Sequence, residues 1–257
     1  MRLPLLLLFT VLLAGCAGGL KINTDYISKD QDNRVQYLVL HYTSTDSKGS
    51  LKTLTQGGVS AHYLVDEDGT IYRLVDESRR AWHAGESEWQ GRTWLNSSSI
   101  GIEIVNPGYK DTPAGRVWYR YSDKQIDAVV ALVKDIQARQ HIRPGNIIGH
   151  SDIAPQRKVD PGPFFPWKRL ADAGLIYWPQ PAVVAQRMAS LGNYLPPADW
   201  FQSQLARLGY TVPQTGIFDT ATRNVIAAFQ MKYRPERFDG QPDIQTAALM
   251  LALPDNR

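Results

Sequence analysis

Apolar and polar residues between positions 35 and 178 follow the two-residue period of strands in some segments and the helical period in another. The short apolar runs that predict strands lie at residues 35–40, 59–65, 71–75, 99–105 and 146–150. Asp68-Gly69 separates the second run from the third, which predicts a hairpin. Ser122 and Gln125 form a capping box before apolar residues at helical spacing, so a helix is expected to begin there. The pattern predicts an α/β domain, with a mixed central sheet flanked by helices, over residues 35–178.

The pattern changes after residue 178. Prolines punctuate residues 179–195, which predicts a linker. Residues 196–257 then carry apolar positions at helical spacing, and Asp219 and Asp243 occupy N-cap positions ahead of two of these segments. We therefore expect a small all-α domain of three helices in this part of the chain.

The first residues have a pattern of their own. Arg2 precedes an apolar run that is shorter than the ~20 residues of a spanning helix, so residues 1–15 predict a signal peptide. The run ends at Leu13-Ala14-Gly15-Cys16, which resembles the processing box of bacterial lipoproteins, where the cysteine thiol carries lipid. We therefore expect lipid on Cys16 and a polar tether over residues 16–34. Because Ala17 rather than an aspartate follows, an outer-membrane lipoprotein facing the periplasm is favoured over inner-membrane retention; an ordinary signal peptide is the alternative.

Charge and cysteine content narrow the possible functions. The chain has 28 Lys and Arg against 25 Asp and Glu, a formal net charge of +3, and this balance gives no case for nucleic-acid binding. Cys16 is the one cysteine, so the rest of the chain has no cysteine to hold a metal. Any metal there must be bound by histidine, aspartate or glutamate.

Polar residues at the ends of predicted strands are the candidates for chemistry. His41 and His150 each end an apolar run, and Asp160 lies in a turn rich in proline and glycine. Two histidines and a carboxylate suit a zinc centre with one open position, although isolated histidines are often structural. Glu103 interrupts the apolar strand at 99–105. A carboxylate there is costly unless it is paired or functional, or unless that face of the strand is solvated.

Several motifs containing these residues occur in order along the α/β segment. They are Leu40-His41-Tyr42-Thr43, Ser60-Ala61-His62-Tyr63-Leu64, Ala81-Trp82-His83-Ala84-Gly85, Ser99-Ile100-Gly101-Ile102-Glu103, Gly149-His150-Ser151-Asp152-Ile153-Ala154-Pro155 and Arg157-Lys158-Val159-Asp160-Pro161-Gly162. Together they resemble the AmpD/AmiD-type zinc-dependent N-acetylmuramoyl-L-alanine amidases, and within them the lipoprotein branch. The C-terminal segment resembles the three-helix peptidoglycan-binding domain, through Leu208-Gly209-Tyr210, Thr215-Gly216-Ile217-Phe218-Asp219, Ala228-Phe229-Gln230 and Asp239-Gly240.

The resemblance implies a hydrolase that acts on peptidoglycan and muropeptides. Its reaction would use zinc-activated water to cleave the amide between the lactyl group of N-acetylmuramic acid, with the anhydro form as a further candidate, and L-alanine of the stem peptide. The implied zinc ligands, for one ion per chain, are His41, His150 and Asp160. Glu103 is the implied general base and Lys158 the implied donor to the oxyanion.

Other positions are implied less directly. His83, Arg92 and Asn106 match positions near the substrate groove, whereas His62 is expected to be structural. A non-catalytic peptidoglycan-binding lipoprotein is the alternative function, because the same fold also serves receptors that do not cut. Such receptors typically lack a complete ligand set, and this chain retains both histidines, the aspartate, the glutamate and the lysine.

Overall fold

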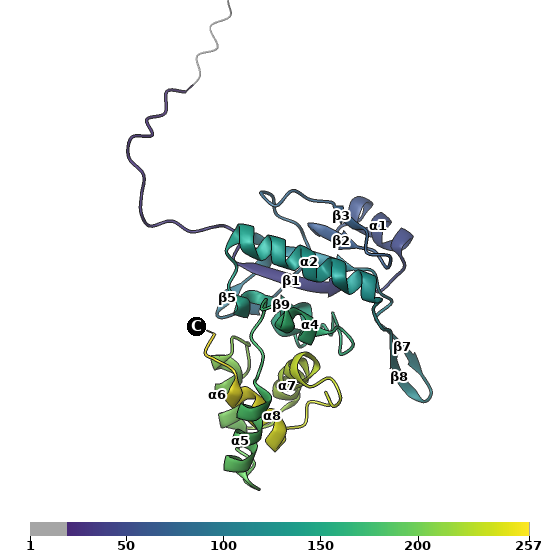
Figure 1. The fold of residues 1–257 in the computed structure, drawn as a ribbon, viewed down its shortest axis with the longest axis vertical. Helices are drawn as coiled ribbons and strands as arrows, with labels where there is room; N and C mark the ends of the chain where they lie inside the picture. The colour runs from purple at the N-terminus through teal and green to yellow at the C-terminus, as the bar shows by residue number, and fades with distance from the viewer. Residues whose placement is uncertain (1–19, 257) are drawn as a thin grey trace, which may run out of the picture. The chain divides into compact units, whose positions relative to one another are not determined.

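The central sheet of the computed structural model has the strand order β3-β2-β6-β1-β9. Figure 1 labels four of these strands, β1, β2, β3 and β9. Its strands are β1 (Tyr37–Tyr42), β2 (Tyr63–Val65), β3 (Ile71–Arg73), β6 (Ser99–Ile104) and β9 (Ile147–Gly149). β1 runs parallel to both β6 and β9, and β2 runs parallel to β6. β3 pairs with β2 in the antiparallel direction, as the predicted hairpin requires. The mixed α/β architecture predicted from the sequence is therefore confirmed.

The structure describes residues 20–256. The predicted signal peptide at 1–15 and Cys16 lie outside the described residues. The chain divides into Met1–Asp32 and Asn33–Arg257, and the described part of the first segment, residues 20–32, contains neither helix nor strand. None of the helices in the described part of the chain is long and apolar enough to cross a membrane.

The two faces of the sheet have different partners. Leu38, Leu40 and Ile102 point to one face, where they share a core with α2 (Asp123–Gln140). Ser122 caps α2 as predicted, because its side chain accepts a hydrogen bond from the backbone of Gln125. The alternating residues of the same strands point to the opposite face, and this is the face that carries the candidate site.

Several elements are not predicted by the sequence pattern. These are α1 (Ser47–Gln56), the hairpins β4–β5 (Glu88–Trp89 and Arg92–Thr93) and β7–β8 (Tyr109–Thr112 and Gly115–Trp118), the 3-10 helices η1 (Leu95–Ser97) and η2 (Pro144–Asn146), and the short helices α3 (His150–Ile153) and α4 (Trp167–Asp172). In α1 only Ser50 and Leu54 are buried, so this helix has almost no apolar stripe to detect. Each of the two hairpins forms a separate sheet of two strands.

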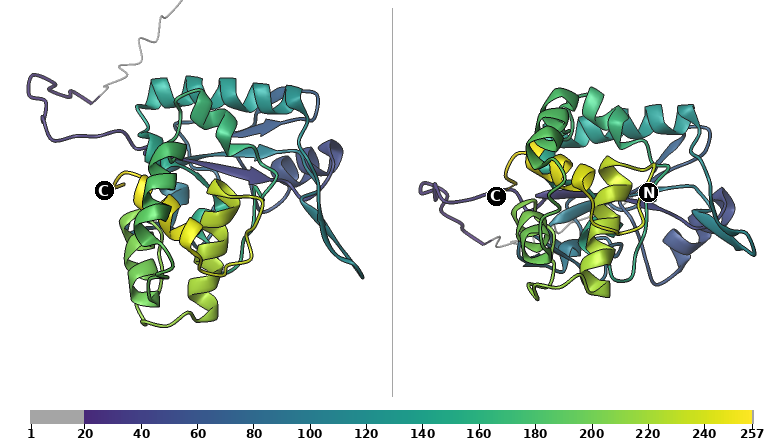
Figure 2. Two further views of the ribbon diagram at one scale, coloured as in Figure 1. Left: turned by 60° about the horizontal axis from the view of Figure 1, so that its bottom comes forward. Right: turned by 90° about the horizontal axis from the view of Figure 1, so that it is seen from below.

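The C-terminal part contains four helices (Figure 2), which are α5 (Pro181–Leu191), α6 (Ala198–Arg207), α7 (Thr220–Tyr233) and α8 (Ile244–Ala252). Asp219 and Asp243 cap α7 and α8 as predicted. The prediction of a linker over 179–195 is wrong, because α5 occupies most of that segment. Pro181 stands at the start of α5, where proline favours a helix because its fixed backbone angle fits the first turn.

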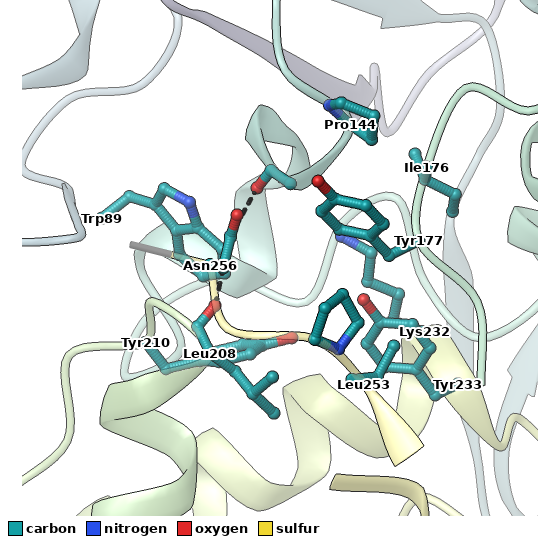
Figure 3. Close-up of a pocket in the computed structure, with 12 residues that line it drawn as sticks. Trp89, Pro144, Ile176, Tyr177, Leu208, Tyr210, Lys232, Tyr233, Leu253 and Asn256 are labelled. Carbon is teal, nitrogen blue, oxygen red and sulfur yellow. Dashed lines mark hydrogen bonds between the residues drawn. The ribbon is translucent and has the colours of Figure 1, made fainter. Parts of the chain in front are cut away.

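The C-terminal helices share a core with the second face of the sheet. Tyr37, Val39 and Ile148 of the sheet belong to the same buried cluster as Phe201 and Phe229 of the helices. A small cavity of about 20 Å³ remains at this junction (Figure 3). Residues 33–257 thus form one unit, in which the helical part buries apolar surface of the α/β part.

A buried polar cluster also joins the two parts. Lys232 of α7 lies 3.0 Å from a carboxylate oxygen of Asp152, and the hydroxyl of Tyr210 donates to the other oxygen over 2.9 Å. Asp152 is in α3, two residues after His150. Lys232 of the helical part therefore anchors the short helix that carries a candidate ligand. Beside this cluster, the Asn256 amide donates to the carbonyls of Gly145 and Leu208 (Figure 3).

Candidate active site

The parallel strands bring the candidate residues to one edge of the sheet. His41 of β1 and Glu103 of β6 are register partners, and His150 follows the last residue of β9. The carboxyl ends of parallel strands form a common edge, which is where open α/β sheets place their ligands. Asp160 is brought to the same edge by its own backbone, because its carbonyl accepts a 2.8 Å hydrogen bond from the amide of Ser151.

Three donor atoms converge at this edge. Nδ1 of His41 lies 2.9 Å from Nδ1 of His150, and each of these nitrogens lies 3.0 Å from Oδ2 of Asp160. All three side chains are buried. Donors of a tetrahedral zinc ion stand about 3.3 Å apart for bonds of about 2.0–2.1 Å, so a small outward shift of each atom would admit the ion.

The chemical state of the donors also suits a cation. Burial and the neighbouring His150 lower the pKa of His41 to about 4, although Asp160 acts in the opposite direction. Burial would raise the pKa of Asp160, but the two histidines hold it well below its usual range. Nε2 of His150 lies 3.0 Å from the carbonyl of Ala84, which can only accept, so a proton on Nε2 has a partner there when Nδ1 binds a cation. A neutral imidazole and an ionised carboxylate are the forms that bind metal, so the donor set fits zinc.

Glu103 has an environment that favours proton transfer. Its Oε2 atom is buried and has no hydrogen-bond partner in the protein. Burial, helped by the charge of Asp160, raises the pKa of Glu103 well above its ordinary value, while Lys158 acts to lower it. A carboxyl group with a raised pKa can both accept and return a proton near neutral pH.

Two adjoining hollows surround these groups. The first, of about 190 Å³, is lined by His41, Glu103, His150, Lys158 and Asp160 together with residues of α1 and Trp82. The second, of about 390 Å³, shares Lys158 and Asp160 with the first and extends toward Tyr109 at the start of β7. Trp82 is 52% exposed, and so presents an aromatic face at the margin of the first hollow.

The structure places the remaining predicted residues differently. Arg92 is exposed in β5 and lines neither hollow. Asn106 also lines neither, because its amide donates to the carbonyl of Arg120 and accepts from the backbone of Gly108. Neither side chain faces the two described hollows, and their role in substrate binding stays a prediction. His83 lines the first hollow, but both ring nitrogens face other protein groups.

His62 is structural in its contacts, as expected. Its Nδ1 accepts from the amide of Gly101 over 3.0 Å, and its Nε2 lies 3.2 Å from the carbonyl of Arg79. Sequence reasoning missed Ser99, which supports His83, although a signal was present. Ser99, Gly101 and Glu103 alternate with isoleucines, so these small and polar residues share the site-facing side of β6.

Comparison with known proteins agrees with this geometry. Residues 31–163 match the N-acetylmuramoyl-L-alanine amidase family, and residues 196–250 match a peptidoglycan binding domain family. The chain is 41% identical to N-acetylmuramoyl-L-alanine amidase AmiD of Escherichia coli (strain K12) over 259 residues, which cover 95% of this chain and 94% of the relative.

Two solved structures are similar over nearly the whole chain. A complex of AmiD from Escherichia coli with the substrate anhydro-N-acetylmuramic acid-L-Ala-D-gamma-Glu-L-Lys superposes with a TM-score of 0.85, covering 91% of this chain and 94% of that one at 41% identity. AmpDh3 from Pseudomonas aeruginosa superposes with a TM-score of 0.86, covering 91% and 98% at 39% identity. With the family match and the identity to AmiD, these similarities show that the chain belongs to the N-acetylmuramoyl-L-alanine amidase family.

Proposed function

We propose that this protein hydrolyses the amide between the lactyl group of N-acetylmuramic acid and L-alanine of the peptidoglycan stem peptide, with the anhydro form among its substrates. The observation that carries the proposal is the convergence of His41, His150 and Asp160 beside the unpartnered carboxyl of Glu103 in one hollow. The similarity to a structure that holds an anhydro-muramyl peptide supports the substrate class. The C-terminal family match supports peptidoglycan itself as a partner.

His41, His150 and Asp160 would hold the zinc ion. Zinc in a three-ligand site with an open position supplies Lewis acidity and makes water nucleophilic at neutral pH. The ligand set is complete within one chain, in keeping with one ion per chain.

Glu103 and Lys158 would carry the proton and charge transfers. Glu103 removes a proton from the attacking water as the carbon–oxygen bond forms, and returns it to the amine of L-alanine as the carbon–nitrogen bond breaks. The Lys158 ammonium lines both hollows, so it can donate to the oxygen that gains negative charge. The Arg80 guanidinium lies 4.1 Å from the centre of the Trp82 ring, and the exposed part of this ring offers apolar surface to a sugar ring.

Loss of a ligand should remove metal and activity together. We expect His41→Ala to reduce the bound zinc from one ion per chain to a small fraction and to abolish turnover, because two remaining donors cannot retain the ion. Zinc content after gel filtration, together with peptide release from an anhydro-muramyl peptide, measures both effects. His141→Asn, at an exposed helix end with φ of 55°, is the control and should keep both. Full zinc content in His41→Ala would refute the ligand set.

We also propose that the protein is an outer-membrane lipoprotein that faces the periplasm. The support is the sequence Leu13-Ala14-Gly15-Cys16 after an apolar run. Acyl chains on Cys16 would hold the enzyme at the membrane, since two or more chains anchor stably where one does not. Cys16→Ala in the full chain should move the protein from the membrane fraction to the soluble fraction. Unchanged membrane association of this variant would argue against lipid at Cys16.

A further inference from the structure

Four buried histidine rings lie next to one another and lead up to the candidate metal site. In order of contact they are His62, His83, His41 and His150. The rings of His62 and His83 have centroids 5.8 Å apart, those of His83 and His41 5.1 Å apart, and those of His41 and His150 4.5 Å apart. His83 lies between the structural His62 and the candidate ligand His41. It has no ring nitrogen left for a substrate, because Nδ1 faces His41 and Nε2 faces Ser99.

The directions of the hydrogen bonds can be assigned by starting at Ser99, which contacts the ring of His83 on the side away from His41. The hydroxyl of Ser99 lies 2.7 Å from the carbonyl of Leu95, which can only accept, so the hydroxyl proton points there. The Ser99 oxygen must then accept across the 3.1 Å contact from Nε2–H of His83. A neutral His83 with its proton on Nε2 has a lone pair on Nδ1.

The hydrogen bond between His83 and His41 links this chain of contacts to the metal site. Nδ1 of His83 lies 3.0 Å from Nε2 of His41, and it can only accept there, so Nε2 of His41 carries the proton. In that tautomer Nδ1 of His41 keeps its lone pair, the form that binds a cation, whereas in the other tautomer Nδ1–H would donate to Asp160 over 3.0 Å. Ser99 and His83 together favour the tautomer of His41 that binds a cation over the one that donates to Asp160.

We propose that His83 is a positioning residue, which with Ser99 fixes the tautomer and ring orientation of His41 for metal binding. The inference rests on the proposed metal site and deepens it. Partners of this kind, which hold the second nitrogen of a metal-binding histidine, typically change metal affinity by about 10–100-fold when they are removed.

Close contacts restrict both the ring and the backbone of His83. A Cβ atom added at Gly101 would lie 2.4 Å from Cγ of His83. The His83 ring therefore occupies the space that the side chain of a larger residue at position 101 would need. The amides of His83 and Ala84 both donate to the side-chain oxygen of Asn96, over 3.0 and 2.8 Å. These contacts fix the backbone and the ring together, which a group that must adapt to substrate would not need.

Three variants of the full chain test the proposal by zinc affinity, measured without substrate in competition with a chromophoric chelator. His83→Leu removes the acceptor and should weaken zinc binding by about 10–100-fold. His83→Asn keeps an acceptor oxygen near the Nδ1 position and should restore most of the affinity. Ser99→Ala removes the group that orients His83, so it should weaken zinc binding less than His83→Leu does. His141→Asn is the control and should bind as the parent chain does.

A spectroscopic readout separates positioning from packing. In ¹⁵N-resolved NMR of the zinc-loaded protein, Nε2 of His41 should carry a proton that is hydrogen-bonded to Nδ1 of His83, and Ser99→Ala should shift the resonance of that proton. This readout also decides the matter where His83→Leu fails to fold, since Ser99→Ala removes only a hydroxyl. Parental zinc affinity in His83→Leu, equal losses in His83→Leu and His83→Asn, or an unchanged resonance of the His41 Nε2 proton in Ser99→Ala would each overturn the proposal. If the parent chain itself binds no zinc, the proposed function fails as well, which distinguishes the two failures.

Discussion

Glu103→Gln is expected to lower kcat by about 10²–10⁴-fold, the usual contribution of a positioned general acid–base group, and to leave zinc bound. The amide has nearly the shape of the carboxyl group but cannot take the proton of the attacking water. Glu103 is not one of the three residues whose donor atoms converge, so its replacement should not release the ion. Peptide release under single-turnover conditions and zinc content of the same sample measure the two effects.

Glu67→Gln is the matched control for this variant. Glu67 is exposed at the turn between β2 and β3, away from the hollows that surround the candidate ligands. We expect its activity to equal that of the parent chain. Parental turnover in Glu103→Gln would remove Glu103 from the mechanism, and loss of zinc in that variant would mean that the carboxyl group helps to hold the ion.

Lys232→Met is expected to lower the free energy of unfolding by about 3–5 kcal/mol, as removal of one partner from a buried ion pair does. Lys232 and Asp152 are 5% and 1% exposed at their side chains, and they lie 3.0 Å apart. Removing the ammonium group leaves the carboxylate with the amide of Gly149 and the hydroxyl of Tyr210 but with no positive charge. Urea denaturation of the full chain gives the change.

Arg237→Met provides the comparison within the same helical part of the chain. Its ion pair with Asp239 is about half exposed and its contact with Asp243 is 3.6 Å long, so their loss should cost no more than about 1 kcal/mol. Asp152→Asn combined with Lys232→Met should recover part of the stability, because no unpaired charge then remains. A loss below about 1 kcal/mol in Lys232→Met would show that the pair does not couple the helical part to the loop that carries His150.

Sequence reasoning found the residues whose position along the chain itself carried a signal. His41 ends an apolar strand and Glu103 interrupts one, and the parallel pairing of β1 and β6 puts the two side by side. His150 likewise follows an apolar run, that of β9. The fold class followed from the same strands, because a two-residue period decides which residues face the core.

Other features depend on contacts that no local pattern encodes. The two ring nitrogens of His83 contact His41 of β1 and Ser99 of β6. A resemblance in sequence around His83 could not show that its ring faces these residues. Asn106 and Arg92 match family positions in sequence, but the orientation of a side chain is set by turn and hairpin geometry. Helix α5 was hidden because Pro181 indicates a break in one context and a helix start in another.

The central claim is most directly tested by identifying the bond that is cut. The purified protein would be incubated with an anhydro-muramyl tripeptide, with a chelator, and with the chelator followed by zinc, and the products read by mass spectrometry. We expect a free tripeptide that begins with L-alanine, absent with chelator and recovered with zinc. Intact substrate in a sample that contains one zinc per chain, or a product cut at any other bond, would contradict it.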